Sequence, residues 1–224
     1  MSTTEPADRP KVKMVIFDNN GTMFDDLPIA YGSVGAIFRH YGLLVPTLDT
    51  YRNGIQSDFT RFYRRHGFYA FPKVTGDDLN VIRRAYYLEH QGEAKYYPEV
   101  GPVLAILKKL GLILAVVSSE IPATLMESLT VAQLRDYFEV IHGGAWPKAP
   151  ALQERLYQFS LMGPEAVYVD DQVDGIEAAK SLGMRTIGMV GPGAYCSPER
   201  IIAAAPTATA VNFSELTEII TDMM

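Results

Sequence analysis

Short apolar runs recur along the chain, and helical patterns lie between them. The runs are continuously apolar rather than alternating, which is typical of strands buried on both faces, as in a parallel sheet. Strands that alternate with helices in this way predict a doubly wound α/β fold. The predicted strands span residues 13–17, 112–117, 137–142, 166–169, 185–190 and 207–212, and the helices between them span 99–110, 121–134, 150–161 and 174–182.

One segment interrupts this alternation. Residues 27–97 contain no convincing strand, and their apolar residues follow helical spacing at about 28–41, 56–66 and 77–94. Asp77 and Asp78 are good candidates for capping the last of these helices. We therefore expect a small all-helical cap domain at 27–97, inserted into a Rossmann-like core domain formed by 11–26 and 98–224.

The composition excludes several classes of protein. The chain has 224 residues, 48% of them hydrophobic, which is enough for one sizeable core and a smaller module. Its net charge of -6 leaves no basic excess for binding nucleic acid or an anionic membrane. The single cysteine, Cys196, allows no intramolecular disulfide, and the longest apolar run, "LGLILAVV", is too short to span a bilayer.

The N-terminal stretch "MSTTEPADRPKVK" is polar and lacks an apolar segment, so it predicts a short disordered leader rather than a signal peptide. A single cysteine without a disulfide partner in the chain is typical of proteins from a reducing compartment. Together with the polar N-terminal stretch, it predicts a cytoplasmic protein. The sequence carries no indication of the oligomeric state.

Reactive side chains follow the predicted strands at their carboxyl ends, where open α/β sheets bind ligands. Asp18 follows the first strand, Ser118 the second, and the pair Asp170–Asp171 follows the strand at 166–169; Lys148 precedes that strand. A carboxylate nucleophile, a hydroxyl, an ammonium and two more carboxylates are the parts that phosphoryl transfer requires.

The adjacent carboxylates of Asp170 and Asp171 indicate a metal ion. On a regular strand they would point to opposite faces, so both can reach one ion only if the strand has ended there. Like charges this close repel each other unless a cation lies between them. Mg²⁺ is the oxygen-ligand ion that meets phosphate, and we expect it here. Asp174 is either a supporting partner of the site or, as the pattern favours, the N-cap of the next helix.

Four motifs in this order resemble those of the haloacid dehalogenase superfamily of phosphatases. "VIFDNNGTMFD" is similar to a strand followed by D-x-D-G-T, and "LILAVVS" to a strand ending in Ser or Thr. "WPKAPALQERL" provides the Lys before a helix, and "VYVDDQVDGIEAAKSLGM" the acidic pair. The helical insertion resembles the cap of the phosphoglycolate-phosphatase-like branch, and the resemblance covers nearly the whole chain.

The resemblance implies a role for each residue at these motifs. Asp18 would be the nucleophile that forms an aspartyl-phosphate, and Lys148 would act on the same phosphate. Thr22, Ser118 and Ser119 would bind the substrate. The implied Mg²⁺ ligands are Asp18, the backbone carbonyl of Asn20, Asp170 and Asp171. The implied partner is a small phosphorylated molecule.

Asn20 departs from the family pattern. The Asp that usually stands there protonates the leaving oxygen and then activates water, and an amide can do neither. Three functions follow, in this order: a slow Mg²⁺-dependent phosphatase, a non-catalytic or weakly active binder of a phosphorylated ligand, and a haloacid dehalogenase. The acidic pair argues against the last, because displacing halide requires no Mg²⁺ cluster.

The predicted cap contains a basic and aromatic stretch, "DFTRFYRRHGFYAFPK", at 58–73. It predicts an amphipathic helix with its aromatic side chains inward and its basic side chains in water. The alternative is a lid on which Arg61, Arg64 or Arg65 binds a distal anion of the substrate.

Overall fold

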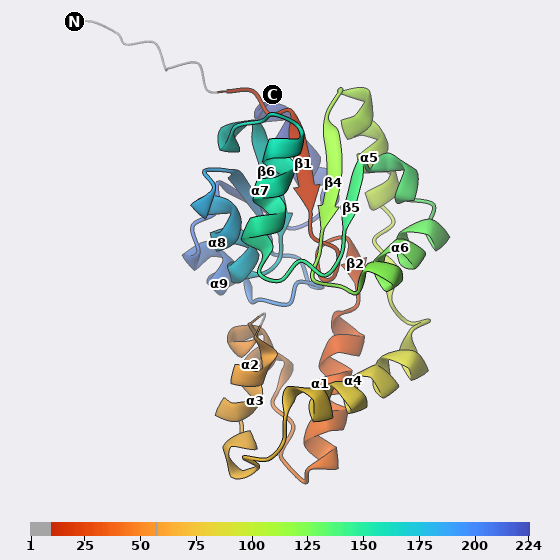
Figure 1. Ribbon diagram of the computed structural model, residues 1–224, viewed down its shortest axis with the longest axis vertical. Helices are drawn as coiled ribbons and strands as arrows, with labels where there is room; N and C mark the ends of the chain where they lie inside the picture. Colours follow the sequence, from red (N-terminus) through yellow and green to blue (C-terminus); the bar gives the residue numbers. More distant parts are fainter. Residues whose placement is uncertain (1–9, 57) are drawn as a thin grey trace, which may run out of the picture.

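The computed structural model describes residues 10–56 and 58–224, so most of the predicted leader lies outside the described residues. In this part of the chain one sheet of six parallel strands has the order β5-β4-β1-β6-β7-β8 (Figure 1). This confirms the predicted fold class. The strands are β1 (Met14–Phe17), β4 (Ile113–Val117), β5 (Val140–His142), β6 (Ala166–Asp170), β7 (Arg185–Met189) and β8 (Ala208–Ala210).

Helices cover both faces of this sheet, which explains the continuous apolar runs. On β1, Val15 and Phe17 pack into one hydrophobic cluster and Met14 and Ile16 into another, and all four are fully buried. The first cluster includes side chains of α5 (Val100–Lys109), α6 (Pro122–Val131) and α10 (Phe213–Asp222). The second includes side chains of α7 (Lys148–Gln158) and α8 (Val173–Ser181). The remaining helix of this part of the chain is α9 (Pro198–Ala203), which lies between β7 and β8 in the sequence.

The helical segment lies below the carboxyl end of β1 in Figure 1 and has a hydrophobic cluster of its own. Its helices are α1 (Leu27–His40), α2 (Leu48–Gly54), α3 (Phe59–Arg65) and α4 (Gly76–His90). Sequence analysis did not predict α2. Helix α4 begins after Thr75, which forms a reciprocal capping box with Asp78, so Asp78 contributes to the cap from the first turn. The boundaries of 27–97 as a separate domain stay a prediction.

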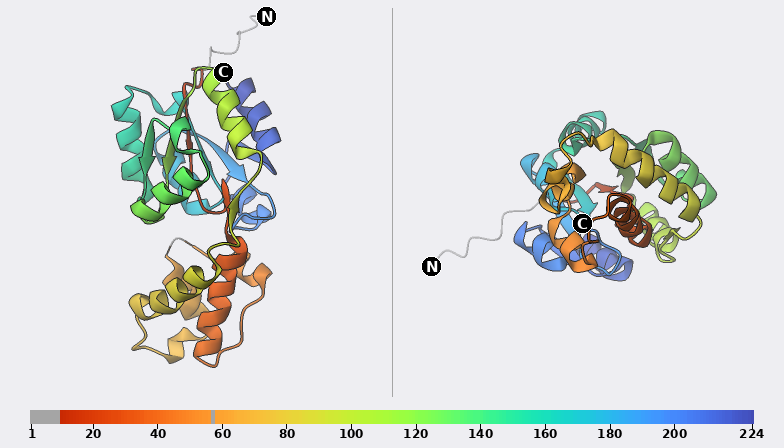
Figure 2. Two further views of the ribbon diagram at one scale, coloured as in Figure 1. Left: turned by 90° about the vertical axis from the view of Figure 1, so that its right-hand side faces the viewer. Right: turned by 90° about the horizontal axis from the view of Figure 1, so that it is seen from below.

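The expectation of no strand in 27–97 is wrong at one place. β2 (Phe24–Asp25) pairs antiparallel with β3 (Lys95–Tyr96), where the chain enters and leaves the helical segment. Two paired residues are too short to produce an alternating pattern that a sequence could show. The two connections are thus joined side by side, as the left view of Figure 2 also shows.

Three short 3₁₀ helices complete the described elements: η1 (Phe68–Ala70), η2 (Arg135–Tyr137) and η3 (Gly163–Glu165). Among the described residues, no helix combines the length and the apolar character that a membrane span requires.

Candidate active site

Three carboxylates meet at the carboxyl end of the parallel sheet. Asp18 directly follows β1, Asp170 is the last residue of β6, and Asp171 is next in the chain. They come together because β1 lies between β4 and β6 and pairs in register with both. Carboxylate oxygens of Asp18, Asp170 and Asp171 all lie within 4.8 Å of one another, and the three residues are buried.

Lys148 joins this cluster from the first residue of α7. Its Nζ lies 3.0 Å from Oδ1 of Asp18 and 2.7 Å from Oδ2 of Asp170, and its side chain is only 10% exposed. Burial lowers the pKa of Lys148, but attraction to the two carboxylates outweighs this and raises the pKa above its ordinary value. The ammonium therefore stays charged between the two carboxylates.

The cluster holds more negative charge than one lysine offsets. Burial raises the pKa of Asp18 to about 6, with Lys148 opposing the shift and Asp170 adding to it. Burial also raises the pKa of Asp171 well above its ordinary value, and repulsion from Asp170 and Asp18 adds to it. Buried carboxylates this close are stabilised by a divalent cation, and a set of hard oxygen donors suits Mg²⁺. The cluster therefore fits a metal site.

Asp171 is held in position from two parts of the chain. The Thr22 hydroxyl donates to its Oδ1 at 3.0 Å, and the backbone N–H of Tyr195 donates to its Oδ2 at 2.6 Å. Gly21 has φ +76°, and a Cβ there would lie 2.3 Å from Oδ2 of Asp171. The structure thus places the Thr22 hydroxyl on a candidate metal ligand, whereas the sequence predicted it on the substrate.

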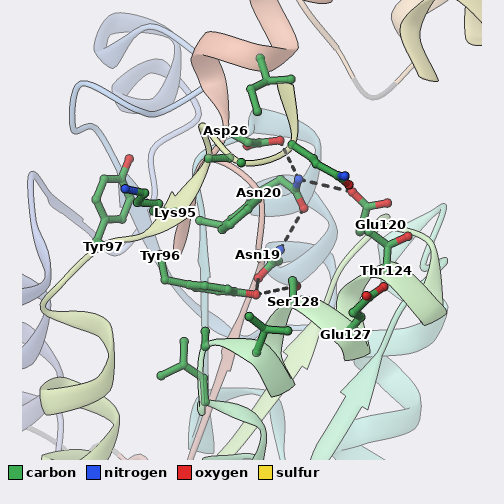
Figure 3. Close-up of a pocket in the computed structure, with 18 of the residues that line it drawn as sticks. Asn19, Asn20, Asp26, Lys95, Tyr96, Tyr97, Glu120, Thr124, Glu127 and Ser128 are labelled. Atoms are coloured by element: carbon green, nitrogen blue, oxygen red, sulfur yellow. Dashed lines mark hydrogen bonds between the residues drawn. The ribbon is translucent and has the colours of Figure 1, made fainter. Parts of the chain in front are cut away.

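The Asn20 side chain lies between further carboxylates (Figure 3). Its Nδ2 donates to Oδ2 of Asp26 at 2.7 Å and to Oε2 of Glu120 at 3.4 Å. The Asn19 amide donates to its Oδ1 at 3.1 Å. Both polar atoms of Asn20 therefore have partners, and the amide hydrogens point at acidic side chains.

Asp26 is the centre of this second group. It is fully buried, and its Oδ2 also accepts a hydrogen bond from the Tyr195 hydroxyl at 2.7 Å. Burial raises the pKa of Asp26 to about 6, while the hydrogen bonds from Asn20 and Tyr195 lower it and Glu120 raises it further. Asn20 and Tyr195 thus stabilise a carboxylate that burial alone would leave protonated over a wider pH range.

Sequence analysis missed Asp26, Glu120 and Tyr195. Asp26 could have been found as the second Asp after the first motif, and Glu120 as the acidic residue after Ser118–Ser119. Tyr195 gives no such signal, because it reaches Asp26 across 169 positions of the chain.

Other predicted site residues lie near the cluster. Ser118 is buried directly after β4, and its hydroxyl oxygen accepts a hydrogen bond from the Glu120 N–H at 3.2 Å. Ser119 is exposed and lines a hollow together with Lys148. Their contact with a substrate stays a prediction, as do the roles of Asp18 and of the Asn20 carbonyl.

The expectation that Asp174 is a helix N-cap is wrong. Helix α8 has Gln172 at its N-cap, so Asp174 lies in the first turn. The helix starts early because the N–H of Gln172 donates to Oδ1 of Asp170 at 2.8 Å, which fixes the turn directly after the strand.

The basic side chains of the helical segment lie elsewhere. Arg61 forms an ion pair with Asp58 at 3.2 Å, and Arg64 lines a hollow between α3 and α4. Among the described residues, those lining the pocket at Asn20 include neither these two nor Arg65. The geometry therefore favours the surface interpretation of these arginines over the lid.

Comparison with known proteins identifies the family. The sequence profile of the family described as "Haloacid dehalogenase-like hydrolase" matches residues 15–189, from β1 to the end of β7. The chain belongs to the haloacid dehalogenase-like hydrolases. This confirms the family that the four motifs predicted.

Individual members of this hydrolase family resemble the chain over most of its length. A phosphoglycolate phosphatase from Neisseria gonorrhoeae is 25% identical, with 87% of this chain and 91% of that protein covered. A haloacid dehalogenase-like protein of unknown function from Agrobacterium tumefaciens has the same fold, with a TM-score of 0.79, 20% identity and coverage of 95% and 99%. A family hydrolase from Deinococcus radiodurans, solved with bound phosphate and sodium, has a TM-score of 0.73, 18% identity and coverage of 96% and 97%.

Proposed function

We propose that this hydrolase is a Mg²⁺-dependent phosphatase of small phosphomonoesters, with Asp18 as its nucleophile. The observation that carries the proposal is the buried cluster in which Lys148 lies 3.0 Å from Asp18 beside Asp170 and Asp171. The phosphatase name of the Neisseria relative and the phosphate bound by the Deinococcus neighbour support it.

The chemistry follows from the positions of these side chains. A carboxylate oxygen of Asp18 attacks phosphorus, the bond to the alcohol oxygen breaks, and an aspartyl-phosphate forms; water then cleaves it to phosphate and regenerates Asp18. Lys148 offsets negative charge beside the attacking carboxylate. Mg²⁺ held by Asp18, Asp170, Asp171 and the Asn20 carbonyl would supply further positive charge at the phosphate oxygens.

Asn20 limits the rate of this reaction. Its amide has no titratable proton, so the leaving oxygen must take its proton from water, and no side chain at position 20 activates the hydrolytic water. Loss of such proton transfer costs about 10²–10⁴-fold in rate. We therefore propose slow turnover, fastest with leaving groups that need no protonation.

The test is phosphate release from a panel of small phosphomonoesters, with Mg²⁺ and with EDTA. Asp18→Asn is the inactive control, and Asn20→Asp restores the missing carboxyl. Because Asn20 donates to Asp26 and Glu120, the single change would place a third carboxylate against two others. The double variant Asn20→Asp/Asp26→Asn removes the nearer of these two repulsions, that with Asp26 at 2.7 Å, and should be the faster one.

The proposal requires the protein and the Asn20→Asp variants to release phosphate above the Asp18→Asn control, and only with the metal. If none does so with any ester, the phosphatase proposal is refuted.

A binder of a phosphorylated ligand is the second candidate. The observation in its favour is that both polar atoms of Asn20 are already hydrogen-bonded, which leaves the position ordered but without a proton to transfer. Saturable binding of a phosphorylated ligand without turnover in any variant would support it. Chloride release from 2-chloropropionate without added metal would instead identify a dehalogenase.

A further inference from the structure

A pocket of about 810 Å³ opens beside the loop that follows Asp18. Asn19 and Asn20 form one wall, β3 and the end of α4 form a second, and α6 forms the third (Figure 3). Pockets of this size hold molecules much larger than a two-carbon ester. Because its wall begins at Asn19, directly after the proposed nucleophile in the chain, the pocket is placed to receive the part of the substrate beyond the phosphate.

The charged side chains that line this pocket are mostly acidic. Among the described residues they are Asp26, Glu120 and Glu127, against one cation, Lys95. In Figure 3 the Lys95 nitrogen points toward Tyr97, on the opposite side from Glu120 and Glu127. The pocket thus has a negative side, at Asn20 and α6, and a carboxylate there would meet charges of its own sign.

Asp26 gives a second, independent indication of a ligand. It is fully buried, and its Oδ2 accepts hydrogen bonds from Asn20 and Tyr195. Its Oδ1 is also buried but has no hydrogen-bond partner among the described residues. A buried carboxylate oxygen without a donor is costly, and an N–H donor from a bound molecule would satisfy it.

Aromatic rings complete the wall near these carboxylates. Phe24 and Tyr96 pack with their centroids 4.8 Å apart, and both line the pocket. The Tyr96 hydroxyl is fixed by the side chains of Asn19 and Ser128, at 3.0 and 2.9 Å. Ring faces attract organic cations and exclude water around them.

We infer that the substrate carries an ammonium group on its leaving alcohol, and that the pocket binds this group against Glu120, Glu127 and Asp26. This inference rests on the proposed phosphatase function and specifies its substrate class. It separates the chain from enzymes of carboxylate-bearing esters such as phosphoglycolate, because the acidic side of the pocket repels an anion and attracts a cation.

Three esters with the same spacer test the inference: 3-aminopropyl phosphate, n-butyl phosphate and 4-phosphooxybutanoate. Each has three methylenes after the ester oxygen, and they differ only in the ammonium, methyl or carboxylate at the far end. With Mg²⁺, kcat/KM for the amine should exceed that for the carboxylate by on the order of tenfold or more, with the neutral ester between them.

Matched variants assign the preference to the pocket. Glu120→Gln and Glu127→Gln should each reduce the ratio of kcat/KM for the amine to that for the butyl ester by several-fold, mainly through KM, and the double variant should reduce it further. Glu218→Gln, at an exposed position on α10, also removes one negative charge, and it should leave the ratio unchanged.

The outcomes distinguish this inference from the function on which it rests. If neither these esters nor p-nitrophenyl phosphate, whose leaving group needs no protonation, is hydrolysed above the Asp18→Asn control, the phosphatase proposal fails. If p-nitrophenyl phosphate alone is hydrolysed, the phosphatase proposal stands and the substrate inference is refuted. If all three are hydrolysed but the carboxylate ester is used as well as the amine, the substrate inference alone is refuted. An equal effect of Glu120→Gln on all three esters also overturns it, because the carboxylate would then act on the reaction and not on the ammonium.

Discussion

Asp18 should make the stability of the metal-free protein depend on pH in a direction that the structure fixes. Burial raises its pKa from 3.8 to about 6, so the folded form holds this proton more tightly than the unfolded chain does. The free energy of unfolding therefore falls as pH rises between these two values. From about pH 4.5 to about pH 7.5, Asp18 alone accounts for a loss of about 2 kcal/mol.

Asp18→Asn removes this titration with almost no change in side-chain size. The free energy of unfolding is measured with urea in EDTA, for the variant and for the wild type. The value for the variant minus that for the wild type should rise by about 2 kcal/mol from about pH 4.5 to about pH 7.5. This rise should be somewhat larger because Asp18 also raises the pKa of Asp171. Saturating Mg²⁺ should reduce the difference, since the ion then stabilises the wild-type carboxylates.

Asp222→Asn, at an exposed position on α10, is the matched control for losing one negative charge. If the difference in the free energy of unfolding between the wild type and Asp18→Asn stays constant with pH in EDTA, the reasoning is refuted. Asp18 would then not be the desolvated carboxylate that the cluster geometry describes.

Further substitutions test individual contacts. Lys148→Met should abolish phosphate release and, in EDTA at neutral pH, lower the free energy of unfolding by about 3–5 kcal/mol, because it leaves buried carboxylates without their cation. Gly21→Ala should weaken Mg²⁺ binding measured by calorimetry, because its Cβ would lie 2.3 Å from a cluster carboxylate; Gly42→Ala has a similar φ of +67° with nothing within 4 Å and should leave binding unchanged. Tyr195→Phe should cost about 1–3 kcal/mol in urea unfolding, because it removes a hydrogen bond from buried Asp26.

The sheet could be predicted because each strand is buried on both faces. Val15 and Phe17 face one layer of helices and Met14 and Ile16 the other, so every position of β1 is apolar and the run is visible in one sequence. The order of the strands then places Asp18 beside Asp170. The short ladder of β2 and β3 had no such signal, because two residues cannot display a period.

The candidate site could be predicted where its residues lie at the end of a strand or the start of a helix. Asp18 and Asp170 come together through the sheet, Lys148 reaches them from the first residue of α7, and the sequence grouped all three. Tyr195 joins the site through a long-range contact, and no local pattern marks it. The resemblance implies that Thr22 binds the substrate, and this stays a prediction; its hydrogen bond to Asp171 at 3.0 Å joins residues 149 positions apart, which no local pattern shows.

Asn20 shows what the structure adds to a substitution that sequence alone treats as a missing carboxyl. An amide at this position donates to both Asp26 and Glu120, two acidic side chains that would repel a third. The same amide helps to hold Asp26 as a buried carboxylate at the edge of the acidic pocket. An amide at position 20 therefore suits the acidic side chains around it, because it donates hydrogen bonds to two carboxylates that a third carboxylate would repel. An Asp at position 20 would face Asp26 at the shorter of these two hydrogen-bond distances, so the double variant Asn20→Asp/Asp26→Asn should exceed the single one because it removes that repulsion.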